Sequence, residues 1–211
     1  MQSGNTAWLK WMIVVIGTVL IASTWLLNQG PGTAKVRHWI SKGLLYTAWV
    51  RTQSSGEHIK PWPWAKTWPL ARLSIPDLGV EHIVVAHASE KSVEFTLGHL
   101  ESSVPPGEVG NSGLLVRREG YYEFLKSLKP NDLLELESLH SGKWLYRVSA
   151  VYVVPKTNTQ ILASSSNRRL TLISCYPCNS EKESYFRYVI VADEVDKTNE
   201  TEVKAITTSA R

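Results

Sequence analysis

Seven short, mostly apolar runs of strand-like pattern recur along the chain between residues 71 and 192. The runs are rich in Val, Ile, Leu and Tyr, and turn-forming sequences such as PDLG at residues 76–79 separate them. This pattern predicts an all-β domain, either a sandwich or a closed barrel. We expect seven strands, at residues 71–75, 80–86, 112–117, 133–137, 144–154, 169–175 and 186–192, and a short helix at residues 121–128.

The N-terminal region follows a different pattern, because residues 11–27 (WMIVVIGTVLIASTWLL) carry no charge over seventeen positions. A helix of this length is just able to cross a bilayer, with Trp8, Trp11 and Trp25 as interface anchors. A cleaved signal peptide is the competing interpretation, but its apolar core would be shorter and its cleavage site better marked than residues 32–34 (GTA). We therefore expect a transmembrane signal anchor.

The segment between this anchor and the β domain has two parts. Apolar residues between Val36 and Val50 recur at helical spacing, which predicts an amphipathic helix that packs on its own domain or lies on the membrane. Residues 60–69 (KPWPWAKTWP) contain three prolines, which exclude a regular helix or a central strand. We expect them to form an extended clasp with its tryptophans buried against the barrel.

The net charge of +4 is concentrated near the N-terminus, where the first 60 residues contain six cations and one acidic residue, Glu57. Cations beside an apolar segment favour anionic lipid head groups and give no support for nucleic-acid binding. On their own, Lys35, Arg37 and Lys42 favour a cytoplasmic position for the residues that follow the apolar segment. Residues 193–211 are mostly polar and are predicted to form a disordered tail.

The main candidate for chemistry is Cys175, in the run TLISCYP at residues 171–177. It ends a predicted strand and Arg187 follows on the next one, so we expect a nucleophilic thiol near a guanidinium, as in acyl-transfer sites. Cys178 completes a C-x-x-C motif of the kind that thiol redox proteins use. Such motifs normally open a helix, whereas here the chain leads into another strand. Oxidation of Cys175 would block acyl transfer.

Four blocks in the right order resemble the signature blocks of sortases. They are residues 60–65 (KPWPWA), 106–111 (PGEVGN), 171–177 (TLISCYP) and 187–190 (RYVI). The first block resembles the Gram-negative branch of that family in particular. The resemblance extends over residues 44–192.

Sortases are membrane-anchored cysteine transpeptidases with an eight-stranded β-barrel, and they act on exported proteins that carry an LPxTG-like C-terminal signal. The resemblance implies that Cys175 is the nucleophile and that Arg187 stabilises the oxyanion, with Ser174 and Thr171 contributing to substrate binding. It also implies a periplasmic domain on the inner membrane, an exported protein and membrane lipids as partners, and no cofactor. The expected organisation is an N-terminal segment (1–10), the anchor (11–27), a juxtamembrane helix and linker (28–59), the barrel (60–192) and the tail (193–211).

One part of the family pattern is missing after Asn111. Sortases continue there to a Gly-His-Arg-Asp stretch that supplies the catalytic histidine, but this chain has Arg117 at the histidine position. Arginine favours a nearby thiolate, yet it does not give up a proton near neutral pH. A positioned acid contributes about 10²- to 10⁴-fold in rate. The sequence therefore leaves three hypotheses open: an enzyme that tolerates Arg117, a catalytically impaired homologue that binds sorting-signal peptides and, as a distant third, a C-x-x-C thiol redox protein.

The other histidines offer no clear replacement for the missing acid. His99 resembles a loop histidine of sortases that is not the catalytic one, and we expect it to hydrogen-bond to the backbone. For His87, near a predicted strand end, we also favour a structural role. The histidines are scattered and the C-x-x-C pair does not repeat, so the sequence predicts no metal site. All six are His38, His58, His82, His87, His99 and His140.

Overall fold

The computed structural model describes residues 4–29, 31–87, 96–116, 122–177 and 184–195. The chain forms two compact units, Met1–Gly43 and Leu44–Arg211. The first unit contains helix α1 (Gly4–Gln29) and the beginning of helix α2 (Pro31–Ser55). In the part of the chain that the structure describes, no helix combines the length and hydropathy needed to cross a membrane.

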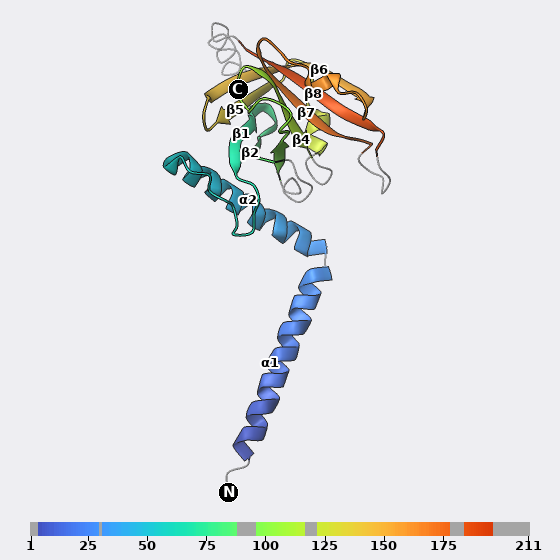
Figure 1. Cartoon of the computed structure of the whole chain (residues 1–211). Coiled ribbons are helices and arrows are strands. Elements are labelled where there is room, and N and C mark those ends of the chain that lie inside the picture. Colours follow the sequence, from blue (N-terminus) through green and yellow to red (C-terminus); the bar gives the residue numbers. More distant parts are fainter. Residues whose placement is uncertain (1–3, 30, 88–95, 117–121, 178–183, 196–211) are drawn as a thin grey trace. The chain divides into compact units, whose positions relative to one another are not determined.

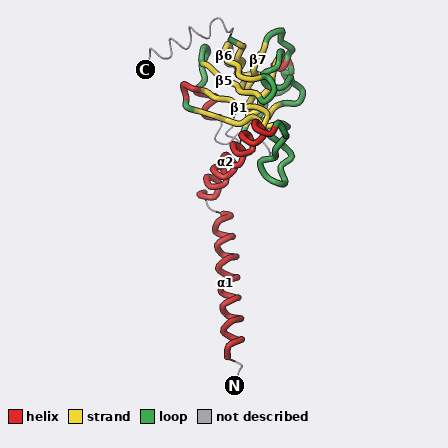
Figure 2. Tube along the Cα trace, turned by 90° about the vertical axis from the view of Figure 1, so that its left-hand side faces the viewer, coloured by secondary structure: helices red, strands yellow, loops and turns green. Residues whose placement is uncertain are grey.

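The second unit contains a closed barrel of eight strands. Figures 1 and 2 show the arrangement of its labelled strands. The strands follow the order β1-β2-β3-β4-β7-β8-β6-β5 around the barrel. The predicted all-β barrel is therefore confirmed. Its strands are β1 (Pro69–Ile75), β2 (Val80–Val85), β3 (Leu97–His99), β4 (Gly110–Val116), β5 (Leu133–Ser138), β6 (Gly142–Pro155), β7 (Arg168–Tyr176) and β8 (Phe186–Glu194), with short helices η1 (Pro76–Leu78), α3 (Tyr122–Ser127) and η2 (Gln160–Leu162) between them.

The alternating residues of the strands build the barrel core. Along β1, for example, buried and part-buried residues alternate without interruption, because successive side chains point to opposite faces of a strand. Leu73, Leu114, Leu172 and Ile190 are among the fully buried members of the core. Burial of each such side chain stabilises the fold by about 1.5–3 kcal/mol. Phe124 of α3 packs against the same core.

Strand β3 is the one element of the barrel that the hydrophobic pattern does not predict. It has only three residues, of which Gly98 and His99 are not typical of a strand. It forms because Leu97 lies between two partners, Val84 of the parallel strand β2 and Val116 of the antiparallel strand β4. Tertiary pairing rather than local propensity therefore creates it.

The part of α2 that belongs to the second unit packs on the outside of the barrel. Leu45 and Trp49 are buried against Ile83 and Val85 of β2. For residues 44–55, packing on the domain itself is therefore confirmed.

The proline-rich segment that follows is only partly buried against the barrel. Trp62 packs against the α2 cluster, but Trp64 is 79% exposed. The prediction that all its tryptophans are buried is thus wrong. Trp64 points away because it lies in a turn, which the backbone hydrogen bond from Ala65 to Trp62 closes at 3.0 Å.

The C-terminal end of the barrel extends further than the sequence predicts. Strand β8 continues to Glu194, so Asp193 and Glu194 belong to the sheet rather than to a tail. Their charges are paired, Asp193 with Arg169 at 2.7 Å and Glu194 with Arg168 at 3.4 Å. Pairing with arginines of the neighbouring strand β7 compensates the charges of these two acidic residues within the sheet. The rest of the predicted tail, residues 196–211, lies outside the described residues.

Candidate functional site

Cys175 and Arg187 face each other across two antiparallel strands. Cys175 is the penultimate residue of β7 and Arg187 the second residue of β8, and the two are direct partners in the register. Direct partners project from the same face of a sheet, with their Cβ atoms about 4.5–5.5 Å apart. The structure therefore brings together the thiol and the guanidinium that the sequence singles out.

Arg187 is half-buried, and its guanidinium has neither an ion pair nor a hydrogen bond within the described residues. This sets it apart from Arg72, Arg168 and Arg169, each of which pairs with a carboxylate. Because the guanidinium retains its five N–H donors, it is able to bind an oxyanion that develops beside Cys175.

The sulfur of Cys175 is not a free thiol in this structure, because Cys175 is disulfide-bonded. The sequence contains one other cysteine, Cys178, which lies outside the described residues. Cys175 is half-buried and packs against the edge of the barrel core. Any nucleophilic chemistry at this position requires reduction first, since the thiolate is the reactive species.

Ser174, expected to contribute to substrate binding, is 1% exposed. Its hydroxyl donates a hydrogen bond of 2.9 Å to the carbonyl oxygen of Val116. Val116 is the last residue of β4, and Arg117, which follows it, lies outside the described residues. Ser174 therefore fixes the end of β4 beside the strand end that carries Cys175.

Thr171, the other residue expected to bind substrate, is fully buried. Its hydroxyl donates to Oδ1 of Asn111 at 2.7 Å. The Nδ2 group of Asn111 in turn donates to the carbonyl oxygens of Ile161 and Ala163, both at 3.1 Å. The hydrophobic pattern does not predict this network. The one sequence feature that marks its place is the Gly110-Asn111 pair at the start of β4.

An apolar surface adjoins the Cys175–Arg187 pair. Ile173 and Val189 lie two residues from Cys175 and Arg187 and are direct partners in the register, so they share the same face. Both are buried by Ile161, and Leu162 packs on the same cluster. The connection between β6 and β7 thus covers the sheet immediately next to the candidate site.

Two histidines have local partners that explain them. His99 is buried, and its Nε2 group lies 2.9 Å from the carbonyl oxygen of Val104. Burial lowers the pKa of His99, so the imidazole is held neutral. The expected structural role of His99 is confirmed, although it lies in β3 rather than in a loop. His87 follows β2 and pairs with Glu101.

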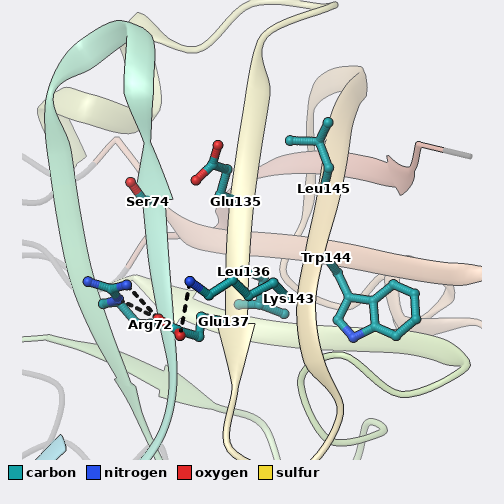
Figure 3. Close-up of a pocket in the computed structure, with 8 residues that line it drawn as sticks. All are labelled: Arg72, Ser74, Glu135, Leu136, Glu137, Lys143, Trp144 and Leu145. Carbon is teal, nitrogen blue, oxygen red and sulfur yellow. Dashed lines mark hydrogen bonds and ion pairs between the residues drawn. The ribbon is translucent and has the colours of Figure 1, made fainter. Parts of the chain in front are cut away.

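A separate surface pocket lies on β1, β5 and β6 (Figure 3). Its β6 residues are at the opposite end of that strand from Val154, which pairs with Arg187. Three of the pocket's charged groups, those of Arg72, Glu137 and Lys143, interact with one another. Arg72 donates from Nε to Glu137 at 2.9 Å, and Lys143 lies 3.4 Å from the same carboxylate, as the dashed lines in Figure 3 show. Gln53 of α2 also donates to Glu137, at 3.2 Å. We interpret this network as a structural tie between the helix and the barrel.

The chain resembles known proteins over the whole barrel. Residues 73–195 match the family model of the sortase domain. Sortase D of Bacillus subtilis (strain 168) is 27% identical over 124 residues, which cover 58% of this chain and 62% of that protein. The match therefore spans less than two thirds of the relative's length.

Solved structures show the same fold. A sortase D5 transpeptidase of Clostridium perfringens superposes with a TM-score of 0.61 at 17% identity, covering 74% of this chain and 99% of that one. Sortase A of Corynebacterium diphtheriae superposes with a TM-score of 0.56 at 20% identity, covering 74% and 84%. Since the matched domain exceeds half of the chain and includes both Cys175 and Arg187, the chain belongs to the sortase family.

Proposed function

We propose that this protein is a cysteine transpeptidase or hydrolase that cleaves an LPxTG-like sorting signal of an exported protein. The observation that carries the proposal is the direct pairing of Cys175 with Arg187 inside a sortase domain. The Cys175 thiolate would add to the carbonyl carbon of the scissile peptide bond, and the oxyanion would form beside the guanidinium of Arg187. The C–N bond then breaks, the leaving amine takes a proton from solvent water, and a thioester remains on Cys175. A second amine or water attacks the thioester and regenerates the thiolate.

Arg117 determines how fast this reaction runs. It occupies the sequence position of the family's histidine, and its charge favours the thiolate if the two side chains lie close. It does not protonate the leaving amine. We therefore propose a slow enzyme, whose rate lacks the 10²- to 10⁴-fold that a positioned acid typically contributes.

The main alternative is a homologue that binds sorting-signal peptides without turnover. The absence of an imidazole at position 117 is the observation that favours it. Both alternatives predict peptide binding, but only the enzyme forms a covalent adduct. The disulfide at Cys175 is compatible with a third, thiol redox function. The placement of Cys175 in strand β7 argues against that function, because redox C-x-x-C motifs normally open a helix.

We also propose that residues 11–27 anchor the protein in the inner membrane, with the barrel in the periplasm. The support comes from the seventeen uncharged residues, and the Gram-negative assignment rests on residues 60–65. An alkaline phosphatase fusion after residue 60 tests the topology. Activity of the fusion is expected, and an inactive, stable fusion would contradict a periplasmic domain.

The activity itself is tested with the full-length, reduced chain and a fluorogenic LPxTG-like peptide. Hydroxylamine, a small amine nucleophile, should accelerate the release of cleaved peptide by resolving the thioester. The Cys175→Ala variant should show only background cleavage. Equal rates for the wild type and this variant would refute the proposed function.

A further inference from the structure

The beginning of strand β4 holds a neighbouring segment in place. Asn111 and Gly113 lie two residues apart and therefore share one face of the strand, whereas Ser112 faces the other way. Asn111 is only 4% exposed. A polar side chain buried to this extent requires hydrogen-bond partners. The partners of Asn111 show which segment packs on this face of β4.

The amide of Asn111 uses both its donor and its acceptor groups. Its Nδ2 group donates to the carbonyl oxygens of Ile161 and Ala163, both at 3.1 Å. Its Oδ1 atom accepts the hydroxyl hydrogen of Thr171 at 2.7 Å, which fixes the orientation of the amide. Asn111 thus ties residues 161–163, between β6 and β7, directly to the sheet.

Gly113 permits the same segment to lie close to β4. A Cβ atom on Gly113 would lie 2.7 Å from Cδ2 of Leu162 and 3.2 Å from Cδ1 of Leu100. Both distances are shorter than ordinary van der Waals contact. The absence of a side chain at position 113 therefore allows Leu162 to pack against the strand.

The segment held in this way covers the face that leads to the candidate nucleophile. Ile161 and Leu162 pack with Ile173 and Val189. These two residues are the nearest neighbours of Cys175 and Arg187 on the same face of β7 and β8. A peptide that reaches Cys175 along this face must pass residues 161–163.

We propose that Asn111 is a positioning residue for the acyl transfer, because it fixes residues 161–163 along the path of the peptide to Cys175. Thr171 assists by orienting the Asn111 amide. Neither side chain touches the peptide, since both are buried. This inference rests on the proposed function. It assigns a role to Asn111 and Thr171, which belong to the sequence motifs but take no direct part in the reaction.

The first test compares KM and kcat of full-length variants for the same LPxTG-like peptide. Asn111→Asp keeps the size of the side chain but replaces both N–H donors with an acceptor that faces two carbonyl groups. Thr171→Val removes the hydroxyl with little change in shape. Each is expected to raise KM about tenfold, as the loss of one to two hydrogen bonds predicts, and to change kcat less than threefold. Thr171→Ser, which retains the hydroxyl, should have the same KM as the wild type.

Ser112→Ala is the matched control for these variants. Ser112 is also buried and lies next to Asn111, but its hydroxyl has no hydrogen-bond partner among the described residues. Its kinetic constants should equal those of the wild type. Gly113→Ala is a second perturbation of the same segment, because the added methyl group displaces Leu162 while every hydrogen bond of Asn111 is retained; it should raise KM in the same direction.

Peptide binding to the Cys175→Ala protein separates this inference from the proposed function. Anisotropy of a labelled peptide measures its affinity without any chemistry. If the wild type turns nothing over but Asn111→Asp in the Cys175→Ala background still weakens binding about tenfold, the enzyme proposal fails, and Asn111 keeps only its role in fixing residues 161–163 for the bound peptide. If folded Asn111→Asp and Thr171→Val proteins bind as tightly as the Ser112→Ala control, the inference is overturned. If the Cys175→Ala protein binds no peptide, both are wrong.

Discussion

At the scale of single residues, the guanidinium of Arg187, which has no ion pair among the described residues, is the feature that distinguishes the candidate site. Arg187→Lys keeps the positive charge but loses the planar, forked arrangement of donors. We expect kcat to fall about 10²- to 10³-fold, the usual consequence of removing a donor to an oxyanion. Stability should change little, because the guanidinium of Arg187 has no hydrogen bond or ion pair among the described residues. Steady-state kinetics and urea denaturation check both statements, and a loss below threefold would contradict the assigned role.

Arg117→His tests the proposal that the protein lacks a general acid at position 117. An imidazole at this position supplies a proton donor that titrates near neutral pH, so kcat/KM should rise about 10²-fold or more. The pH dependence of kcat/KM should become bell-shaped as well. Arg118→His is the matched control, since it introduces the same group one residue away. If the two variants behave alike, position 117 is not the site of the family histidine.

Individual residues also show how far the sequence alone reaches. The pairing of Cys175 with Arg187 is predictable, because both lie near the ends of strong consecutive strand patterns. The burial of Thr171 and Ser174 is not predictable. Alternation assigns each residue to a face of the strand but does not show what covers that face. Thr171 is hydrogen-bonded to Asn111, and Ser174 to the carbonyl oxygen of Val116, both on β4.

At the scale of elements, the contact between helix α2 and strand β2 fixes the helix to the barrel. Trp49 is 2% exposed and packs with Ile83 and Val85. Trp49→Ala should therefore lower the free energy of unfolding by about 3–5 kcal/mol. Tyr46→Ala, on the same helix but 50% exposed, should change it by no more than about 0.5 kcal/mol. Similar urea midpoints for the two variants would show that the helix does not contribute to the fold.

The ion network in the pocket of Figure 3 gives a pH dependence to the contact of β1 with β5. Burial raises the pKa of Glu137, but hydrogen bonds and the charges of Arg72 and Lys143 outweigh it, so the pKa lies below its ordinary value of 4.5. A carboxylate with a lowered pKa stabilises the fold above its ordinary pKa, and this stabilisation is lost as the pH falls through the lowered value.

Glu137→Gln should therefore destabilise the protein by about 1–2 kcal/mol at pH 7, and the difference from the wild type should shrink as the pH falls well below 4.5. Urea denaturation across this pH range measures it. Glu135→Gln, at a more exposed position on the same side of the strand, is the control and should change stability little at any pH. A difference that stays constant down to low pH would rule out the ionised carboxylate as its cause.

The elements that the hydrophobic pattern predicts are those with one face in the core. Seven strands and helix α3 meet that condition, and all are present. Strand β3 is not predicted because three residues are too few to show a strand periodicity. The prediction that Trp64 is buried is wrong because the residue lies in a local turn.

At the scale of the whole molecule, we expect the proposed activity to depend on the oxidation state of Cys175. The disulfide removes the thiolate, so the protein purified without a reductant should neither cleave peptide nor react with iodoacetamide at Cys175. A phosphine or dithiol should restore both reactions. Cys178→Ser, which removes the only other cysteine, should make activity independent of the reductant. Full activity of the unreduced wild type would contradict a nucleophilic Cys175.

The most direct test of the central claim is the intact mass of the reduced, full-length chain after incubation with an LPxTG-like peptide. If Cys175 is the nucleophile of a sortase reaction, the mass should increase by that of the acyl fragment, fragmentation should place the fragment on Cys175, and hydroxylamine should remove it. The Cys175→Ala variant should remain unmodified. A wild-type protein that binds the peptide yet shows no adduct on Cys175 would contradict the proposed function.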